Sequence, residues 1–326
     1  MNRRLLARAL GLSPTVLACA AWGQAGTKLP LVAYLSVGPP PDAELLRRYH
    51  DEFDRLGWRS EVNIRFVERH SGAEPQLLEA AVRDLLALNP ALVMASTTQG
   101  ALAVQRLTRS IPIVMIFGTN PVEMGLAKSL SQPTGNVTGV LTMGAELTSK
   151  LFEMARKMAP RASRIAYVVN PFNPNYERVL ADANEYAQKT KFSVVPLLIR
   201  ASSDVEPAVR SLQPANDFAL IVQIDPLVNQ YLDRLAALAL AAKLPSLSLN
   251  LNWARKGGLI SYGADRNSAL QGAIRMADKI LRGTPVGDIP FEQPLRIPLI
   301  VNRQTARAIG MALPPEIMLA ADEVID

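Results

Sequence analysis

The sequence predicts an α/β protein made of two similar lobes, each built on a mostly parallel β-sheet covered by helices. Three observations predict this fold. The chain has 326 residues, of which 49% are hydrophobic and 20% charged, which is enough for two separate cores. Short apolar, β-branched runs alternate with longer amphipathic stretches, as expected for parallel strands that are buried on both faces. The alternation runs through the first half of the chain and then begins again.

In the first half, continuous apolar runs predict strands and a 3.6-residue period predicts helices. Residues 42–56 illustrate the helical pattern, because Leu45, Tyr49 and Phe53 fall on one stripe. Asn89-Pro90 is expected to end the second helix. The expected strands are 31–35, 63–67, 91–95 and 111–117, and the expected helices are 42–56, 74–88 and 100–108.

The second half repeats this plan. Ile111-Pro112 and Leu244-Pro245 both lie between a helix end and a strand, and proline is tolerated at the first residue of a strand. Two such lobes form a cleft between them, and ligands of parallel sheets bind beyond the carboxyl ends of the strands. The expected helices are 149–158, 176–189, 205–212, 230–242 and 267–281, and the expected strands are 165–169, 193–198, 218–223, 245–249, 260–262 and 295–301.

The loops that follow the expected strands are mostly polar and uncharged. Their hydroxyl and amide groups suit a small polar ligand, and free N–H groups at helix N-termini suit a carboxylate. Asp225 is the one clear acid among them, and it suits an ammonium or hydroxyl group. The same residue types serve as N-caps and turns, so both roles stay open at each position. The residues expected to bind the ligand are Ser36, Thr97, Thr98, Asn120, Asn170, Asn173 and Asp225.

Two further details concern this expected site. We expect the hydroxyls of Thr97 and Thr98, with nearby N–H groups, to hold a carboxylate or a similar acceptor. Phe172 follows Asn170 in the same loop. An aromatic ring there can stack on an apolar part of the ligand, although packing inside the protein is the favoured role.

The N-terminus has the order of a secretory signal. Arg3, Arg4 and Arg8 precede an apolar run over 9–22, and small residues follow, so we expect residues 1–25 to be removed and the mature protein to be periplasmic. The run is short for a membrane span, and a buried N-terminal helix is the alternative. Cys19 is the only cysteine of the chain. The run Val16-Leu17-Ala18-Cys19 also resembles a lipid-attachment site, so lipid anchoring at Cys19 is the second possibility.

Composition and motifs argue against several other functions. The formal net charge is +6, and three of these charges are the arginines of the leader, so a nucleic-acid or membrane surface is not indicated. His50 and His70 have no cysteine or second histidine at metal-ligand spacing, and both suit the surface or packing. Prolines follow Gly38, where a phosphate-binding loop would need N–H donors. We therefore expect no cofactor, no metal and no catalytic residue, and a binding function.

Six runs of the chain match the pattern of one family, namely 111–122, 135–139, 257–263, 277–283, 302–310 and 321–325. In these runs the chain resembles the substrate-binding proteins of ABC importers, in the subgroup that includes tryptophan-binding components. The resemblance implies a type I periplasmic-binding-protein fold, with two Rossmann-like lobes that close on the ligand about a hinge. It places chain crossings near 143–146, 263–267 and 284–289. The first lobe then comprises 28–145 and about 264–288, and the second 146–263 and about 289–326.

The sequence departs from the family pattern at three places. Asn120 and Ser268 stand where the family usually has Asp, and residues 248–254 lack its usual aromatic and charged residues, whereas Asp225-Pro226 is kept. These departures leave the solute open between an amino-acid-like molecule and another organic acid. We expect a monomeric receptor that delivers a small polar ligand to the membrane permease of an ABC importer. A ligand-sensing module for a membrane receptor and a secreted α/β enzyme are the alternatives.

Overall fold

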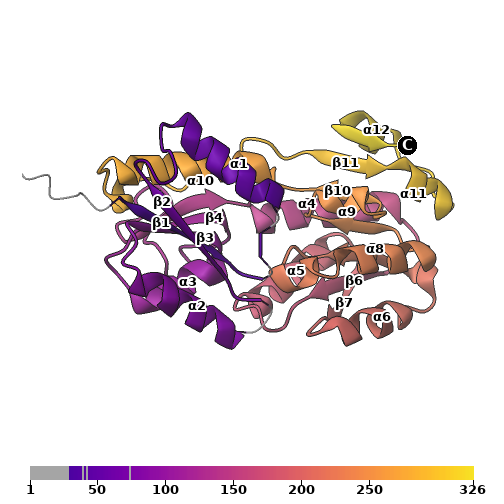
Figure 1. Ribbon diagram of the computed structural model, residues 1–326. Helices are drawn as coiled ribbons and strands as arrows, with labels where there is room; N and C mark the ends of the chain where they lie inside the picture. Colours follow the sequence, from indigo (N-terminus) through magenta and orange to yellow (C-terminus); the bar gives the residue numbers. More distant parts are fainter. Residues whose placement is uncertain (1–28, 39, 42, 73–74) are drawn as a thin grey trace, which may run out of the picture.

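The computed structural model describes residues 29–38, 40–41, 43–72 and 75–326, and it contains two sheets that lie side by side along the molecule (Figure 1). The expected secretory signal and Cys19 lie outside the described residues. No helix in the described part is long and apolar enough to cross a membrane.

The first sheet is parallel throughout, as the continuous apolar runs predict. Alternate residues of its strands face two different cores, so both faces are buried. One core joins the sheet to α1 and α10, and the other joins it to α2 and α3. The sheet has the order β2-β1-β3-β4-β5 and consists of β1 (Leu31–Ser36), β2 (Arg65–His70), β3 (Leu92–Thr97), β4 (Ile113–Gly118) and β5 (Val137–Leu141). Its helices are α1 (Ala43–Arg55), α2 (Pro75–Ala87), α3 (Thr98–Leu107) and α10 (Arg266–Leu281).

The second sheet is parallel except where β11 runs antiparallel to β10. Its order is β12-β11-β10-β9-β8-β6-β7, and its strands are β6 (Arg164–Val169), β7 (Ser193–Leu198), β8 (Phe218–Val222), β9 (Ser246–Ser248), β10 (Ile260–Tyr262), β11 (Leu299–Asn302) and β12 (Glu323–Ile325). The helices on its two faces are α4 (Gly144–Met158), α5 (Tyr176–Lys189), α6 (Ser202–Arg210), α7 (Pro226–Asn229), α8 (Leu232–Ala241), α9 (Asn252–Arg255), α11 (Arg303–Ala308) and α12 (Pro315–Ala320). We call each sheet with its helices a lobe.

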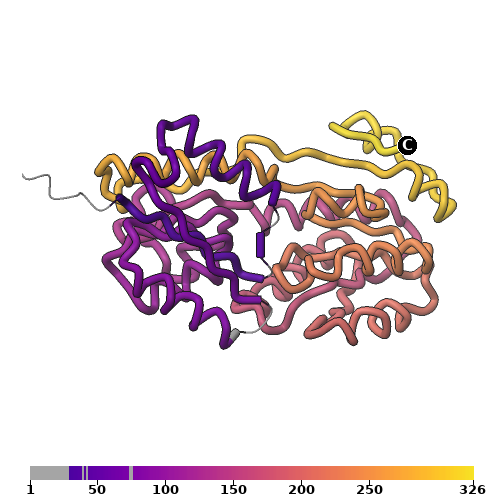
Figure 2. Tube along the Cα trace, in the orientation of Figure 1, coloured from indigo at the N-terminus to yellow at the C-terminus, as the bar shows by residue number. Residues whose placement is uncertain are grey.

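Helix α10 returns to the first lobe although it lies late in the sequence. Figure 2 shows its orange segment beside the indigo N-terminal segment, and the Trp58 indole donates a hydrogen bond of 2.8 Å to Asp278 of α10. The chain therefore crosses between the lobes three times, after β5, after β10 and again after α10.

The third crossing lies later than expected, because the chain stays on the first lobe through Glu292. Leu141 N–H donates to Glu292 O over 2.8 Å, and Glu292 N–H donates to Gly139 O over 3.0 Å. Ile289 and Phe291 are buried in the first-lobe cores. The crossing expected near 284–289 is thus wrong; burial of these two side chains and pairing with the edge strand β5 hold the segment in place.

Several shorter elements were also missed or misplaced. β5, α7, α9, α11, α12 and β12 were not expected, and the helix expected over 230–242 is the slightly shorter α8. The strand expected over 63–67 begins at Arg65, because Asn63 belongs to the preceding turn. Its side chain accepts from Arg59 N–H over 2.6 Å and donates to Gly57 O over 2.8 Å.

Gly139 lies within β5, where a glycine suggests a turn rather than a strand, and its close packing against β4 leads to a stability prediction. It has a φ of +154°, and a Cβ at this position would lie 2.3 Å from Met115 O on the neighbouring strand β4. We expect Gly139→Ala to lower the free energy of unfolding by about 1–3 kcal/mol, because the two strands must move apart. Thermal and urea unfolding measure the change. Gly135→Ala is the matched control, since its Cβ would meet ordinary contact at 3.7 Å; equal losses in both variants would contradict the explanation.

Candidate ligand-binding site

A cavity of about 350 Å³ lies between the lobes. It is placed beyond the carboxyl ends of β1, β3 and β4 on one side and of β8 and β9 on the other, because the strands of a parallel sheet end at one edge. Five of the seven expected site residues line it, namely Ser36, Thr97, Thr98, Asn173 and Asp225. The sequence pattern therefore brings most of the expected set to one place.

Asp225 is the centre of the second-lobe wall. Its side chain is 1% exposed and caps α7, where its Oδ1 accepts from Leu227 N–H over 2.8 Å and from Val228 N–H over 3.2 Å. Two asparagine amides complete its partners. Asn170 Nδ2 donates to Oδ1 over 3.1 Å, and Asn173 Nδ2 donates to Oδ2 over 2.7 Å. Of the described hydrogen bonds, Oδ1 accepts three and Oδ2 accepts one, so Oδ2 has the larger remaining acceptor capacity.

Asn170 and Asn173 shape the loop between β6 and α5. Asn170 Oδ1 accepts from Phe172 N–H and Asn173 Oδ1 accepts from Asn175 N–H, both over 2.9 Å. These are local turns of the kind that asparagine favours. Asn170 does not line the main cavity; it lies behind Asp225 and borders a smaller hollow between the lobes. Each of the two asparagine side chains therefore does two things: its oxygen stabilises a turn of the loop, and its amide nitrogen donates to Asp225.

On the first lobe, the threonines hold the strand ends in place. Thr97 Oγ1 accepts from Gly100 N–H over 3.4 Å and caps α3. Thr98 Oγ1 accepts from Thr119 N–H over 2.8 Å and bonds to Thr119 O over 3.0 Å, so this hydroxyl fixes the segment after β4. Asn120 does not line the cavity. Its φ of +47° turns the chain there, and its carbonyl accepts from Met124 N–H over 3.0 Å.

Two other first-lobe residues line the cavity and were missed. Phe117 near the end of β4 presents a ring to it, and the Arg266 guanidinium lies 4.5 Å from the centre of that ring. An aromatic residue near a strand end could have indicated Phe117. Arg266 follows the second crossing and reaches the cavity only because α10 returns to the first lobe. The cavity is also lined by polar residues outside the expected set, most of them in the polar loops that follow the expected strands, namely Ser96, Gln99, Thr119, Thr142, Asn175, Asn229, Gln230, Asn250, Asn252 and Lys256.

Phe172 does not pack in a core. Its side chain is 56% exposed and borders the smaller hollow, together with Gly38 and Pro226. Packing as the role of Phe172 is therefore wrong. The Asn170 side chain, which accepts from Phe172 N–H, rather than a hydrophobic pocket, fixes the loop that carries it.

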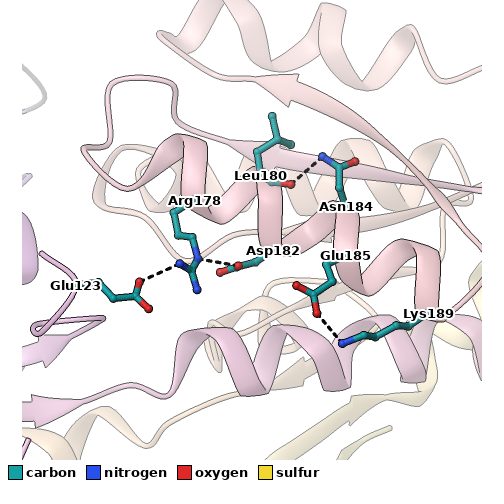
Figure 3. A network of polar contacts seen from close by, with 7 residues as sticks. All are labelled: Glu123, Arg178, Leu180, Asp182, Asn184, Glu185 and Lys189. Atoms are coloured by element: carbon teal, nitrogen blue, oxygen red, sulfur yellow. Dashed lines mark hydrogen bonds and ion pairs between the residues drawn. The ribbon is translucent and has the colours of Figure 1, made fainter.

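The lobes touch each other at the mouth of the cavity. Asn175 Nδ2 donates to Thr119 Oγ1 over 3.4 Å, and Arg178 of α5 lies 3.3 Å from Glu123 of the first lobe (Figure 3). A Cβ at Gly38 would lie 3.4 Å from Pro226 Cβ. We call this arrangement, in which the two lobes are in contact beside the cavity, the closed arrangement. Among the described residues no group of three or more His, Cys, Asp or Glu side chains could hold a metal ion.

A sequence model of the family described as ABC transporter substrate binding protein matches residues 51–325. The chain belongs to this family. This substrate-binding protein is 29% identical over 255 residues to a tyrosine-binding protein of Clostridioides difficile, a match that covers 78% of this chain and 73% of the relative.

Solved structures show the same fold. A conserved domain protein of Vibrio cholerae superposes with a TM-score of 0.83 at 23% identity, covering 91% of this chain and 100% of the other. An ABC domain from Streptococcus pneumoniae in complex with L-Trp superposes with a TM-score of 0.82 at 20% identity, with the same coverage. This substrate-binding protein therefore has the type I periplasmic-binding-protein fold.

The four hydrogen bonds to Asp225 lead to a prediction about stability that can be tested without a ligand. We expect Asp225→Ala to lower the free energy of unfolding by about 1–3 kcal/mol, because two backbone N–H groups and two asparagine amides lose their acceptor. Thermal unfolding of the protein without added solute measures the loss. Asp265→Ala is the control, since Asp265 also caps a helix but accepts from Asn267 N–H as its described bond. A loss no larger than that of the control would contradict the assignment.

Proposed function

We propose that this protein is a monomeric periplasmic receptor that binds one small organic solute between its lobes and delivers it to the permease of an ABC importer. The observation that carries the proposal is the cavity, whose walls come from both lobes and combine one buried acid and two basic side chains, Arg266 and Lys256, with hydroxyl, amide and aromatic groups. Its volume of about 350 Å³ is at the small end of the usual range for ligand sites, roughly 300–1,000 Å³. Membership of the family supports the proposal.

We infer an amino-acid-like solute with an aromatic part. Asp225 Oδ2 would accept from its ammonium or hydroxyl group, because this oxygen takes one of the four described bonds. The start of α3 at Thr97, with its free N–H groups, would hold the carboxylate. Phe117 and Tyr34 would contact the aromatic part. The relative named for tyrosine binding and the neighbour that holds L-Trp support this choice.

A binding panel tests the solute class. Thermal-shift and calorimetric measurements would compare L-tyrosine, L-tryptophan, L-phenylalanine, aliphatic amino acids, sugars and 4-hydroxyphenylpropionate, which lacks the ammonium group. A solute at about 100 times its Kd should stabilise the protein by roughly 2.7 kcal/mol, which raises the unfolding midpoint by a few degrees. We expect an aromatic amino acid to give the largest shift. A protein that binds no member of the panel would contradict the proposed solute class, and a larger shift with 4-hydroxyphenylpropionate would exclude the ammonium contact.

The substitution Asp225→Asn tests the role of the charge. Asparagine is an equally good helix N-cap, so α7 should keep its cap while the negative charge is lost. We expect the affinity for an aromatic amino acid to fall by about tenfold or more, because hydrogen bonds to charged groups contribute about 1.5–3 kcal/mol.

The control for this variant is Asp204→Asn. Asp204 lies in the same lobe, where it accepts from Arg200 N–H over 2.8 Å, and it does not line the cavity. Calorimetry of both variants measures the affinity, and thermal unfolding checks that they are folded. Unchanged affinity in Asp225→Asn would rule out the proposed contact to an ammonium group.

A further inference from the structure

We propose that Arg178 is a positioning residue outside the cavity, whose ion pair with Glu123 across the lobes stabilises the closed arrangement and so slows solute release. The two side chains come from different lobes. Glu123 lies in the turn after β4, and Arg178 lies in α5 (Figure 3). Their closest N–O distance is 3.3 Å, and about half of each side chain is exposed, at 53% and 51%.

The pair is held by rigid elements on both sides. In the first lobe, Leu126 N–H donates to Pro121 O over 2.8 Å and the Leu126 side chain is buried in a core, which fixes the turn that carries Glu123. In the second lobe, Ala183 anchors α5 in the opposite core. The position of the pair therefore follows the relative position of the lobes.

Asp182 aims the Arg178 side chain. It stands one helical turn further along α5, and its Oδ1 accepts from Arg178 Nε over 2.8 Å, which leaves another guanidinium N–H to face Glu123 (Figure 3). The Asp182 carboxylate, and next the Glu123 charge, raise the pKa of Arg178. When the lobes separate, Arg178 keeps Asp182 and loses only Glu123, so opening leaves no buried unpaired charge and stays reversible.

The pair is coupled to the cavity through the loops that carry it. Thr119 and Met124 lie close to Glu123 in the sequence and line the cavity. Asn173 and Asn175 lie just before α5, which carries Arg178, and they also line the cavity. Closing the cavity and forming the pair are consequently one movement. The apparent Kd of a solute equals its intrinsic Kd divided by the fraction of protein in the closed state, so a contact that favours closure raises the affinity without touching the solute.

This inference rests on the proposed function for its binding test, but the closed fraction can be measured separately. Exposed ion pairs are weak, so we expect Arg178→Gln and Glu123→Gln each to weaken L-tyrosine binding by about two- to fivefold, mainly through faster dissociation. The double variant should be no weaker than either single variant, because both remove the same contact. Raising the ionic strength from about 0.05 M to about 0.5 M should weaken binding in the wild type more than in the double variant.

The chain supplies its own matched control. Lys189 and Glu185 form an ion pair of 2.6 Å on the same helix and within one lobe (Figure 3). Lys189→Gln removes a comparable exposed charge and should leave the affinity unchanged. Independent losses that add up in the double variant, or an equal loss in Lys189→Gln, would overturn the proposal.

Small-angle X-ray scattering without solute separates this inference from the proposed function. We expect Arg178→Gln to have a larger radius of gyration than the wild type and than Lys189→Gln, because more molecules are open. If L-tyrosine fails to bind the wild type, the proposed solute is wrong while the scattering still decides the role of Arg178. If all three proteins have the same radius of gyration, Arg178 does not stabilise closure.

Discussion

The buried carboxylate of Asp225 is the interaction on which the second-lobe wall of the cavity depends. It joins α7, through two backbone N–H groups, to the β6–α5 loop, through the amides of Asn170 and Asn173. A carboxylate that is 1% exposed would be costly without such donors. The four bonds offset that cost, and they fix the start of α5 relative to the end of β8. Any solute that reaches Asp225 therefore meets a preformed wall.

In the first lobe, hydroxyl groups rather than a carboxylate hold the strand ends beside the cavity. Thr98 bonds to both backbone groups of Thr119, and Ser96 Oγ accepts from Val37 N–H over 2.9 Å, so the ends of β1, β3 and β4 are linked to one another. The two walls thus differ in chemistry, with an acid on the second-lobe side and hydroxyl groups, an aromatic ring and the Arg266 guanidinium on the first-lobe side. A zwitterionic aromatic solute would use both walls at once, and a ligand selects the closed state only when it has contacts to both lobes.

The sequence could predict what depends on local patterns. The long apolar strands and amphipathic helices follow their periodicity, and α5 and β7 have the expected bounds, because nothing in their surroundings overrides the pattern. The sequence could not show what depends on distant neighbours. Gly139 reads as a turn residue until Met115 O is seen beside it, and Phe291 looks like part of a loop until its first-lobe core is known.

The same distinction holds within the site. Asp225 was predictable, because an acid after a buried strand stands at the ligand edge of a parallel sheet. Asn120 also follows a buried strand, but its backbone is left-handed and the residue does not line the cavity, and one sequence does not reveal that. The place of Arg266 in the cavity could not be predicted from the sequence, because it depends on the return of α10 to the first lobe.

The segment from Asn170 to Arg178 carries both the amides that bond to Asp225 and the contacts to the first lobe. Asn173 bonds to Asp225 within its lobe, whereas Asn175 and Arg178, only a few residues later, reach across to the first lobe. Asn173 Oδ1 also accepts from Asn175 N–H over 2.9 Å, so the residue that bonds to Asp225 is hydrogen-bonded to one that contacts the first lobe. The bond to Asp225 and the contacts to the first lobe therefore lie in one short, hydrogen-bonded segment. Coupling between them does not require a longer route through the core.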